Sequence, residues 1–229
     1  MTPPQFPWIS EAQSHEEPVP SMAQRVREQV IRMIMAGEIK SGQRISEPDI
    51  AKRLGVSRVP VREALRSLDL SGLVTTRINA GVFVRQLSPR EIHELYQIRA
   101  LLDSHAAEVA CGLPAEEHKA LIEILGSYID AMAETEANGN TPLYYEKNLL
   151  FHWEIIRCCK NKKLMEIYQS VTQQLHLCRA SNLSISKSRS ASLAEHRELF
   201  NAIAAGNRSL AARAAEAHAD LALKRLENP

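Results

Sequence analysis

The sequence predicts a mostly α-helical protein in two parts: a small N-terminal unit that ends in a β-hairpin, and a larger C-terminal antiparallel all-helical bundle. Apolar residues recur at helical spacing in successive segments that are bounded by capping residues and glycines. Two short runs in which apolar and polar residues alternate, near 73–76 and 82–85, flank the turn signal Asn79-Ala80-Gly81. Beyond residue 87 the pattern is helical to the end, which favours a bundle.

Charge is distributed unevenly along the 229 residues, although the net charge is only +1. Residues 22–87 hold twelve Lys or Arg against six Asp or Glu, a balance of +6, so the remainder carries −5. A basic module on a mildly acidic body is typical of proteins that contact nucleic acid phosphates. No apolar run approaches the roughly 18 residues of a membrane span, and residues 1–20, expected to form a flexible tail, lack signal-peptide features. The four cysteines form no Cys-x-x-Cys pair and are interpreted as reduced thiols, so we expect a cytoplasmic protein.

The N-terminal unit, 21–87, has the element order of a winged helix-turn-helix. A helix is expected over 22–36, followed by a short strand at Arg44 and Ile45. Ser46 is an N-cap for the next helix, which Gly55 ends, and Ser57 caps a second helix that runs to about residue 71. The hairpin that follows forms the wing.

The C-terminal domain, 88–229, begins with a capping box at Ser88-Pro89-Arg90-Glu91. We expect helices over about 88–111, 115–137, 141–159, 161–181, 193–205 and 207–226, with Asn161 and Asn207 as caps. The alternation of serine with basic residues around 187–192 is interpreted as a loop or a kinked helix end.

The second helix of the helix-turn-helix carries an arginine stripe. Arg58, Arg62 and Arg66 recur every fourth residue, apart from the apolar face formed by Val61, Ala64, Leu65 and Leu68. Arginine binds guanine in a bidentate manner or grips phosphate, and Ser57 could cap the helix, touch phosphate, or do both. A solvated basic face is the alternative that three arginines alone would favour. The surrounding element order favours DNA reading, with Arg77, Asn79 and Gly81 as wing candidates; Arg77 is equally well explained as a solvated strand residue.

Polar residues on three helices of the bundle are candidates for a metal site. Asn148 and His152 are spaced i, i+4 and share a helix face, and His196 and His218 lie on two later helices. Neutral imidazoles with an oxygen ligand suit zinc, nickel or manganese. Taken singly, each histidine is more commonly a partly buried polar residue or a surface residue. Arg99 and Asp103 are also spaced i, i+4, which allows a salt bridge between them.

The N-terminal unit resembles the GntR family of bacterial regulators. The resemblance is carried by the contiguous run Ile50-Ala51-Lys52-Arg53-Leu54-Gly55-Val56-Ser57-Arg58-Val59-Pro60-Val61-Arg62-Glu63-Ala64-Leu65. It implies that Arg58 and Arg62 contact DNA and that Gly81 enters the minor groove. Many members carry an arginine where this chain has Pro48, so operator preference is expected to differ.

The C-terminal domain, over about 88–225, resembles the FCD ligand-binding domain of the FadR-like subfamily. The matching residues are Asn148-Leu149-Leu150-Phe151-His152, Asn161, Leu164, Glu195-His196-Arg197, Ala202-Ile203, Gly206 and His218. The resemblance implies a divalent metal held by Asn148, His152, His196 and His218, with an effector carboxylate near or on it. It also implies that Arg99 faces the pocket and pairs with this carboxylate, with a structural salt bridge to Asp103 as the alternative. The first ligand is usually an aspartate, and Asn148 brings no negative charge. The substitution is expected to weaken the site or change its metal preference.

Together these patterns predict a sequence-specific DNA-binding transcription regulator, and the resemblance implies that a small organic acid controls it. We expect a homodimer on a two-fold related operator, because paired reading heads give affinity for two half-sites. In the first alternative the helical domain only dimerises. In the second the chain is a metal enzyme, which is disfavoured because the His-Glu-x-x-His motif is missing and Glu195, the neighbour of His196 on a helix, is expected to point away from it.

Overall fold

The computed structural model describes residues 20–182 and 186–227, and these form two compact units. The first unit holds the described residues up to Leu87 together with Gln173–Ala180, and the second holds Ser88–Thr172 and the described residues from 181 onward. The expected N-terminal tail, apart from Pro20, lies outside the described residues. Each unit is described by itself below.

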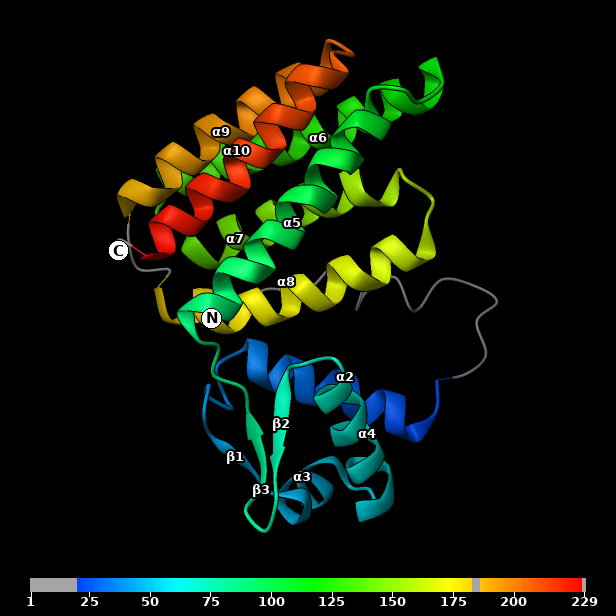
Figure 1. The fold of residues 1–229 in the computed structure, drawn as a ribbon, viewed down its shortest axis with the longest axis vertical. Helices are drawn as coiled ribbons and strands as arrows, with labels where there is room; N and C mark the ends of the chain where they lie inside the picture. Colours follow the sequence, from blue (N-terminus) through cyan, green and yellow to red (C-terminus); the bar gives the residue numbers. More distant parts are fainter. Residues whose placement is uncertain (1–19, 183–185, 228–229) are drawn as a thin grey trace. The chain divides into compact units, whose positions relative to one another are not determined.

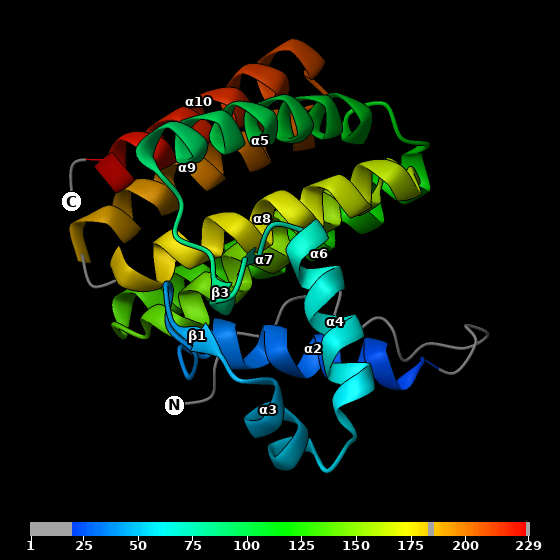
Figure 2. The same cartoon turned by 60° about the horizontal axis from the view of Figure 1, so that its bottom comes forward.

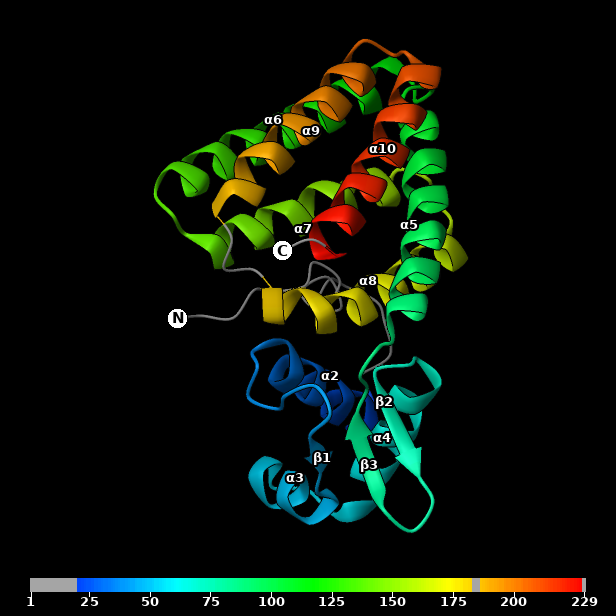
Figure 3. The ribbon, with the colours of Figure 1, turned by 60° about the vertical axis from the view of Figure 1, so that its left-hand side comes forward.

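The first unit is a helix-turn-helix with a small antiparallel sheet. Its elements are α2 (Met22–Met35), β1 (Arg44–Ile45), α3 (Glu47–Leu54), α4 (Arg58–Leu70), β2 (Val74–Arg77) and β3 (Gly81–Val84) (Figure 1). The strands follow the order β1-β3-β2, so β3 pairs with both neighbours, and Phe83 is opposite Arg44 on one side and Thr75 on the other. The β2–β3 hairpin is seen beside α4 in Figure 3. This arrangement is a winged helix-turn-helix, as expected.

The core of the first unit explains why α2 and α4 pack together. Their facing apolar side chains are almost fully buried, including Val30, Ile31, Val61, Leu65 and Leu68. Burying a side chain of this size contributes roughly 1.5–3 kcal/mol. Between α3 and α4, Gly55 adopts φ 65°, a left-handed conformation that glycine takes without strain and that ends α3 sharply.

The second unit is the expected helical bundle. Its helices are α5 (Pro89–Ala110), α6 (Ala115–Ala137), α7 (Thr141–Arg157), the first part of α8 (Lys162–Asn182), α9 (Ser186–Ala204) and α10 (Arg208–Glu227). Helices α5 and α10 lie side by side, and α9 runs along α10 (Figure 2). Buried alanines line both α5 and α10, and their small side chains allow the two backbones to approach closely: Ala106, Ala107, Ala110, Ala211, Ala215 and Ala219.

Caps fix where the bundle helices begin. Ser88 and Glu91 form the expected capping box, and the side chains of Asn161 and Asn207 accept backbone N–H bonds at the starts of α8 and α10. The N-cap of α7 is Asn140, whose Oδ1 accepts from the Leu143 N–H at 3.3 Å. Within the described residues, no helix is long and apolar enough to cross a membrane.

The serine-rich stretch differs from its prediction. Residues 187–192 were expected to be a loop or a kinked helix end before a helix at Leu193, but α9 already begins at Ser186. Contacts from neighbouring helices hold this first part of α9. Arg189 NH1 donates to Thr141 Oγ1 at 2.7 Å, the Tyr144 hydroxyl donates to the Arg189 carbonyl at 3.2 Å, and Ser190 donates to Glu136. These tertiary contacts outweigh the weak helix propensity of serine.

Candidate DNA-reading surface and metal centre

Helix α4 separates an apolar face from an arginine stripe. Val61, Ala64, Leu65 and Leu68 are buried in the first unit, whereas Arg58, Arg62 and Arg66 are exposed. This is the division that a recognition helix needs, because one face must anchor the helix while the other enters the major groove.

The start of α4 differs in one respect from its prediction. Ser57 occupies the expected N-cap position, but its side chain makes no capping hydrogen bond. The exposed hydroxyl is therefore uncommitted at a helix N-terminus, where N–H groups favour a phosphate.

One arginine of the stripe has a carboxylate partner on the preceding helix. Arg62 donates to Glu47 at 3.2 Å, and both side chains keep contact with solvent. An exposed ion pair of this kind contributes at most about 1 kcal/mol, so the guanidinium remains free to turn toward DNA. Pro48, beside Glu47 in the first turn of α3, is exposed and offers no side-chain donor.

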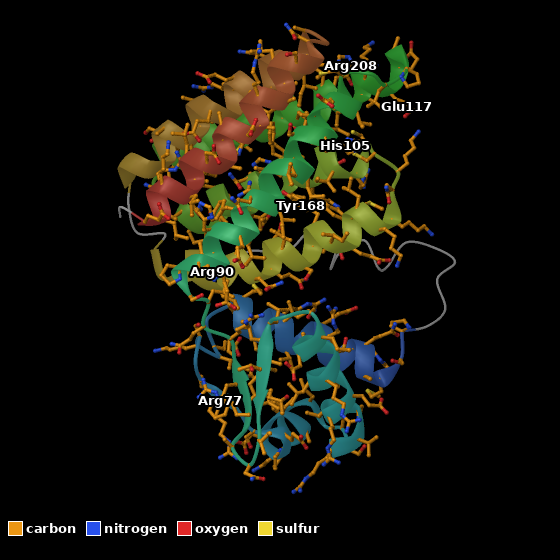
Figure 4. The ribbon with its side chains drawn as sticks, in the orientation of Figure 1. Arg77, Arg90, His105, Glu117, Tyr168 and Arg208 are labelled. Atoms are coloured by element: carbon orange, nitrogen blue, oxygen red, sulfur yellow. The ribbon has the colours of Figure 1, made fainter. Side chains whose placement is uncertain are left out.

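The wing brings its candidate residues to one turn. Arg77, labelled in Figure 4, lies over the Phe83 ring with 4.6 Å between guanidinium carbon and ring centroid. Asn79 (φ 58°) and Gly81 (φ +100°) supply the left-handed backbone of the turn. A Cβ at position 81 would lie 3.0 Å from Nε of Arg44, so this arginine of β1 lies against the turn. Arg44 has no sequence signal as a wing residue, because nothing in the spacing relates it to the hairpin.

The histidine cluster is formed by side chains from α7, α9 and α10. Among the described residues, His152, His196 and His218 each offer a ring nitrogen, and these atoms lie within 4.8 Å of one another. Nε2 of His152 lies 3.1 Å from Nε2 of His196 and 3.2 Å from Nε2 of His218. All three rings are buried. The fold therefore brings together three imidazoles that are 44 and 22 residues apart in the chain.

The partners behind the rings determine which nitrogen carries the proton. His196 Nδ1 lies 2.6 Å from the Ser192 carbonyl and His218 Nδ1 lies 2.9 Å from a Glu195 carboxylate oxygen. Both partners only accept, so each Nδ1–H donates and each Nε2 keeps a lone pair. Arg99 NH2 lies 3.2 Å from His152 Nε2 and can only donate, so this Nε2 also accepts. Three lone pairs therefore face one another.

This geometry fits a divalent metal. With metal–nitrogen bonds of 2.0–2.1 Å, two ligating nitrogens are about 2.9 Å apart at a right angle and about 3.3 Å apart at a tetrahedral angle. The observed separations of 3.1 and 3.2 Å lie between these values. An acceptor-only Nδ1 partner behind a ring is also the usual arrangement behind metal-bound histidines.

Asn148 completes the cluster from α7. Its Nδ2 lies 2.9 Å from His196 Nε2, and its Oδ1 is one of the buried side-chain atoms that lack a hydrogen-bond partner in the described part of the chain. The two ends of an amide are nearly identical in shape, so a half-turn of the group exchanges them. The turned amide directs Oδ1 at the point where the imidazole lone pairs meet. Asn148 is thus placed to act as a neutral oxygen ligand.

Arg99 lies beside this cluster and also makes its expected salt bridge. Its Nε donates to Asp103 at 3.0 Å while NH2 points at His152, and all three side chains are buried. Burial lowers the pKa of Arg99, but Asp103 and the nearby Tyr168 (Figure 4) raise it, and the net direction is upward. Arg99 is therefore a permanent buried cation next to the histidines.

The acid–base state of His196 suits ligation. Burial, followed by the proximity of His218, holds the pKa of His196 well below its usual value. The ring is consequently neutral at physiological pH, which is the form that binds metals.

Glu195 is a functional neighbour whose role sequence reasoning missed. Adjacent helical residues diverge, so Glu195 does not share the direction of His196. It instead reaches across to α10, where it accepts from Nδ1 of His218 and from Arg225. No local pattern could have signalled this role, because the partners of Glu195 lie far along the chain on another helix.

Fold and site together define a class of protein: a winged helix-turn-helix with an exposed arginine stripe, joined in one chain to a helical domain with a buried polar cluster. Such a chain combines DNA binding with a regulatory domain.

Comparisons with known proteins give the family. Residues 22–84 match the model described as "Bacterial regulatory proteins, gntR family", and residues 94–221 match the FCD domain. The chain belongs to the GntR family of bacterial transcription regulators and has an FCD domain, in the FadR-like architecture. This confirms the resemblance inferred from the sequence.

Individual relatives can be aligned with this chain along most of their length. The chain is 30% identical over 191 residues to the uncharacterised HTH-type transcriptional regulator YdhC of Bacillus subtilis, covering 83% of this chain and 84% of that protein. It is 30% identical over 199 residues to the probable D-xylose utilization operon transcriptional repressor of Paenarthrobacter nicotinovorans, covering 86% and 85%. The crystal structure of a putative transcriptional regulator GntR from Rhodococcus sp. RHA1 has a TM-score of 0.76 and 25% identity, covering 91% of this chain and 99% of that chain.

Proposed function

We propose that this regulator binds a two-fold related DNA operator as a homodimer and that a small organic acid, bound in the FCD domain at a divalent metal, controls its operator affinity. The observation that carries the proposal is the set of three imidazole Nε2 atoms whose lone pairs face one another in the bundle. The Nε2 atom of His152 lies 3.1 Å from that of His196 and 3.2 Å from that of His218. Zinc, nickel and manganese suit such a donor set. The metal would be held by Asn148, His152, His196 and His218.

Charge around the cluster supports an anionic effector. The four proposed ligands are all neutral, so a bound divalent ion keeps its full charge, and the cation Arg99 lies next to it. Asp103, already paired with Arg99, offsets only part of this charge. A carboxylate would complement both cations, since guanidinium binds carboxylate in a bidentate manner. The Paenarthrobacter relative, named for D-xylose utilization, makes sugar-derived acids a sensible first group to test.

In the DNA-binding unit, the proposed contacts are Arg58, Arg62 and Arg66 of α4, Ser57 at its start, and Arg77, Asn79 and Gly81 of the wing. The exposure of the α4 stripe and the left-handed backbone of the turn support this assignment. An effector that binds two arrangements of the dimer unequally would shift the population that fits the operator. We propose that the protein is cytoplasmic, where operator DNA is found in bacteria.

The test begins with selection of bound duplexes from a random DNA pool, which yields the operator. Fluorescence anisotropy then measures operator affinity with a panel of mono- and dicarboxylic acids, in wild type and in Arg99→Lys. Lysine keeps the charge of Arg99 but cannot make the two parallel hydrogen bonds of a guanidinium to a carboxylate. An acid that alters operator affinity should therefore be needed at a higher concentration with the variant. Arg90→Lys, on the exposed face of the same helix, is the matched control.

Three results would decide between the candidate functions. An acid that changes operator affinity and is recovered unchanged supports an effector-controlled regulator. Operator binding that no acid alters would leave the helical domain as a dimerisation module. Steady-state conversion of an acid would instead favour the metal enzyme.

A further inference from the structure

Behind the histidine cluster lies a carboxylate that no pattern in the sequence assigns to the site. Glu195 of α9 is largely buried, with 13% of its side chain exposed, and its Oε2 lies 2.9 Å from Nδ1 of His218 on α10. It lies behind the ring, on the side away from the other imidazoles.

Glu195 is itself held in position by a second residue of α10. Arg225 donates from NH2 to Oε2 at 2.9 Å and from NH1 to Oε1, so the guanidinium grips both carboxylate oxygens. His218 and Arg225 are seven residues apart, two turns of one helix, and therefore lie on the same face of α10. These two hydrogen bonds fix the orientation of the Glu195 carboxylate as well as its position.

The three imidazoles differ in how their tautomers are fixed. His196 donates to a backbone carbonyl, that of Ser192, which no substitution removes. His152 accepts from Arg99 and lies 3.8 Å from Asp103. The Nδ1–H of His218 donates to a side-chain carboxylate oxygen, that of Glu195, at 2.9 Å. Its tautomer therefore depends on Glu195.

We propose that Glu195, clamped by Arg225, is the positioning residue that keeps His218 in the Nδ1–H tautomer with its Nε2 lone pair directed into the cluster. A neutral imidazole without such a partner can carry its proton on either nitrogen, and the Nε2–H form cannot ligate a metal. The inference rests on the proposed metal site for its consequence, but the tautomer itself is a property of the metal-free protein.

The first measurement reads the tautomer directly. Histidine labelled with nitrogen-15 is incorporated into the full-length, chelator-treated protein, and ring nitrogen spectra are recorded at about pH 8, above the ordinary histidine pKa. Wild type is expected to show the Nδ1–H form at His218. Glu195→Met, which removes the acceptor, should increase the Nε2–H population, and Glu195→Gln, which keeps an acceptor oxygen, should restore the wild-type form in part.

The second measurement is metal affinity, by competition with a chromophoric chelator for zinc and nickel. Glu195→Met is expected to weaken binding roughly 10- to 100-fold, the usual effect of removing a partner behind a metal-bound histidine. Glu195→Gln should fall between Glu195→Met and wild type. Glu198→Met, at an exposed position one turn further along α9, is the matched control and should behave as wild type in both measurements.

Two safeguards keep the outcomes distinct. If Glu195→Met fails to fold because Arg225 loses its partner, Glu195→Met with Arg225→Met removes the whole charge pair and gives the same readout. If wild type takes up no metal, the metal part of the proposed function fails while the His218 spectrum still decides the inference. An unchanged His218 tautomer in Glu195→Met would overturn the positioning role.

Discussion

The uncharged amide of Asn148 is expected to limit how strongly the histidine cluster holds a metal. Asn148 is buried and neutral like the three histidines, and the two neighbouring carboxylates, Asp103 and Glu195, are already paired with arginines. Metal affinity rises with the number of charged ligands. Asn148→Asp is therefore expected to tighten zinc or nickel binding by about tenfold or more, as measured by chelator competition.

The control for this change is Asn201→Asp, which adds the same charge at an exposed position of α9. It should leave metal affinity as in wild type. Equal affinity in Asn148→Asp and wild type would mean that position 148 is not a ligand.

Arg58 is the single residue from which we expect the largest loss of operator affinity. It is exposed in the first turn of α4, and no described carboxylate is recorded as its ion-pair partner. Arg58→Ala should weaken operator binding by about 1–3 kcal/mol, as for an arginine that reads a base. Anisotropy titration of the selected operator measures the loss.

Arg32→Ala is the matched control for Arg58→Ala. Arg32 is exposed on α2 and lies in the same unit, so its removal changes the net charge equally. If both variants lost the same affinity, general charge rather than the α4 stripe would explain DNA binding.

Among the helices, two serines at N-cap positions are expected to contribute differently to stability. Ser88 accepts from the Glu91 N–H and completes a capping box at α5, whereas Ser57 makes no capping bond at α4. Ser88→Ala should lower the free energy of unfolding by about 1 kcal/mol. Ser57→Ala should leave stability nearly unchanged and weaken operator binding instead. Chemical denaturation and operator titration of both variants test this pair, and a stability loss in Ser57→Ala equal to that in Ser88→Ala would contradict it.

The order of elements was predictable because each boundary has a local signal, and the exceptions have non-local causes. Gly55, Ser88 and Asn161 act within a few residues of their position, so the sequence alone locates them. The start of α9 depends on contacts from Arg189 to Thr141 and from Tyr144 to Arg189, about 45 residues away in the chain. The periodicity of the sequence does not predict contacts between residues that are far apart in the chain.

The candidate metal site also has a part that local sequence signals predict and a part that depends on tertiary packing. Periodicity identified the i, i+4 pair Asn148 and His152, and the convergence of His196 and His218 with this pair follows from tertiary packing. The role of Glu195 could not be predicted, because its partners His218 and Arg225 lie 23 and 30 residues further along the chain, on another helix. Recognising the family supplied the ligand set, but not the arrangement behind it.

For the whole molecule, the segregation of charge has a measurable consequence. The +6 balance of residues 22–87 lies in the unit that carries α4 and the wing. Phosphate contacts release counterions, so operator affinity should fall steeply as salt rises. Arg58→Ala should reduce the slope of log affinity against log salt if Arg58 grips a phosphate, and should leave the slope nearly unchanged if it reads a base.

Assembly is tested at the same scale. Sedimentation of the protein with its selected operator should give two chains of 25.6 kDa per duplex, as expected of a dimer on two half-sites. One chain per duplex would contradict the proposed two-fold recognition.

The most direct test of the proposed regulation is the metal content of the purified, tag-free protein, measured by elemental mass spectrometry beside His196→Ala and the exposed-site control His93→Ala. We expect near-stoichiometric zinc, nickel or manganese in wild type and in His93→Ala, and a large loss in His196→Ala, because His196 contributes one of the three converging lone pairs. No metal in wild type, even after incubation with all three ions, would contradict the metal centre and leave the DNA-binding assignment standing.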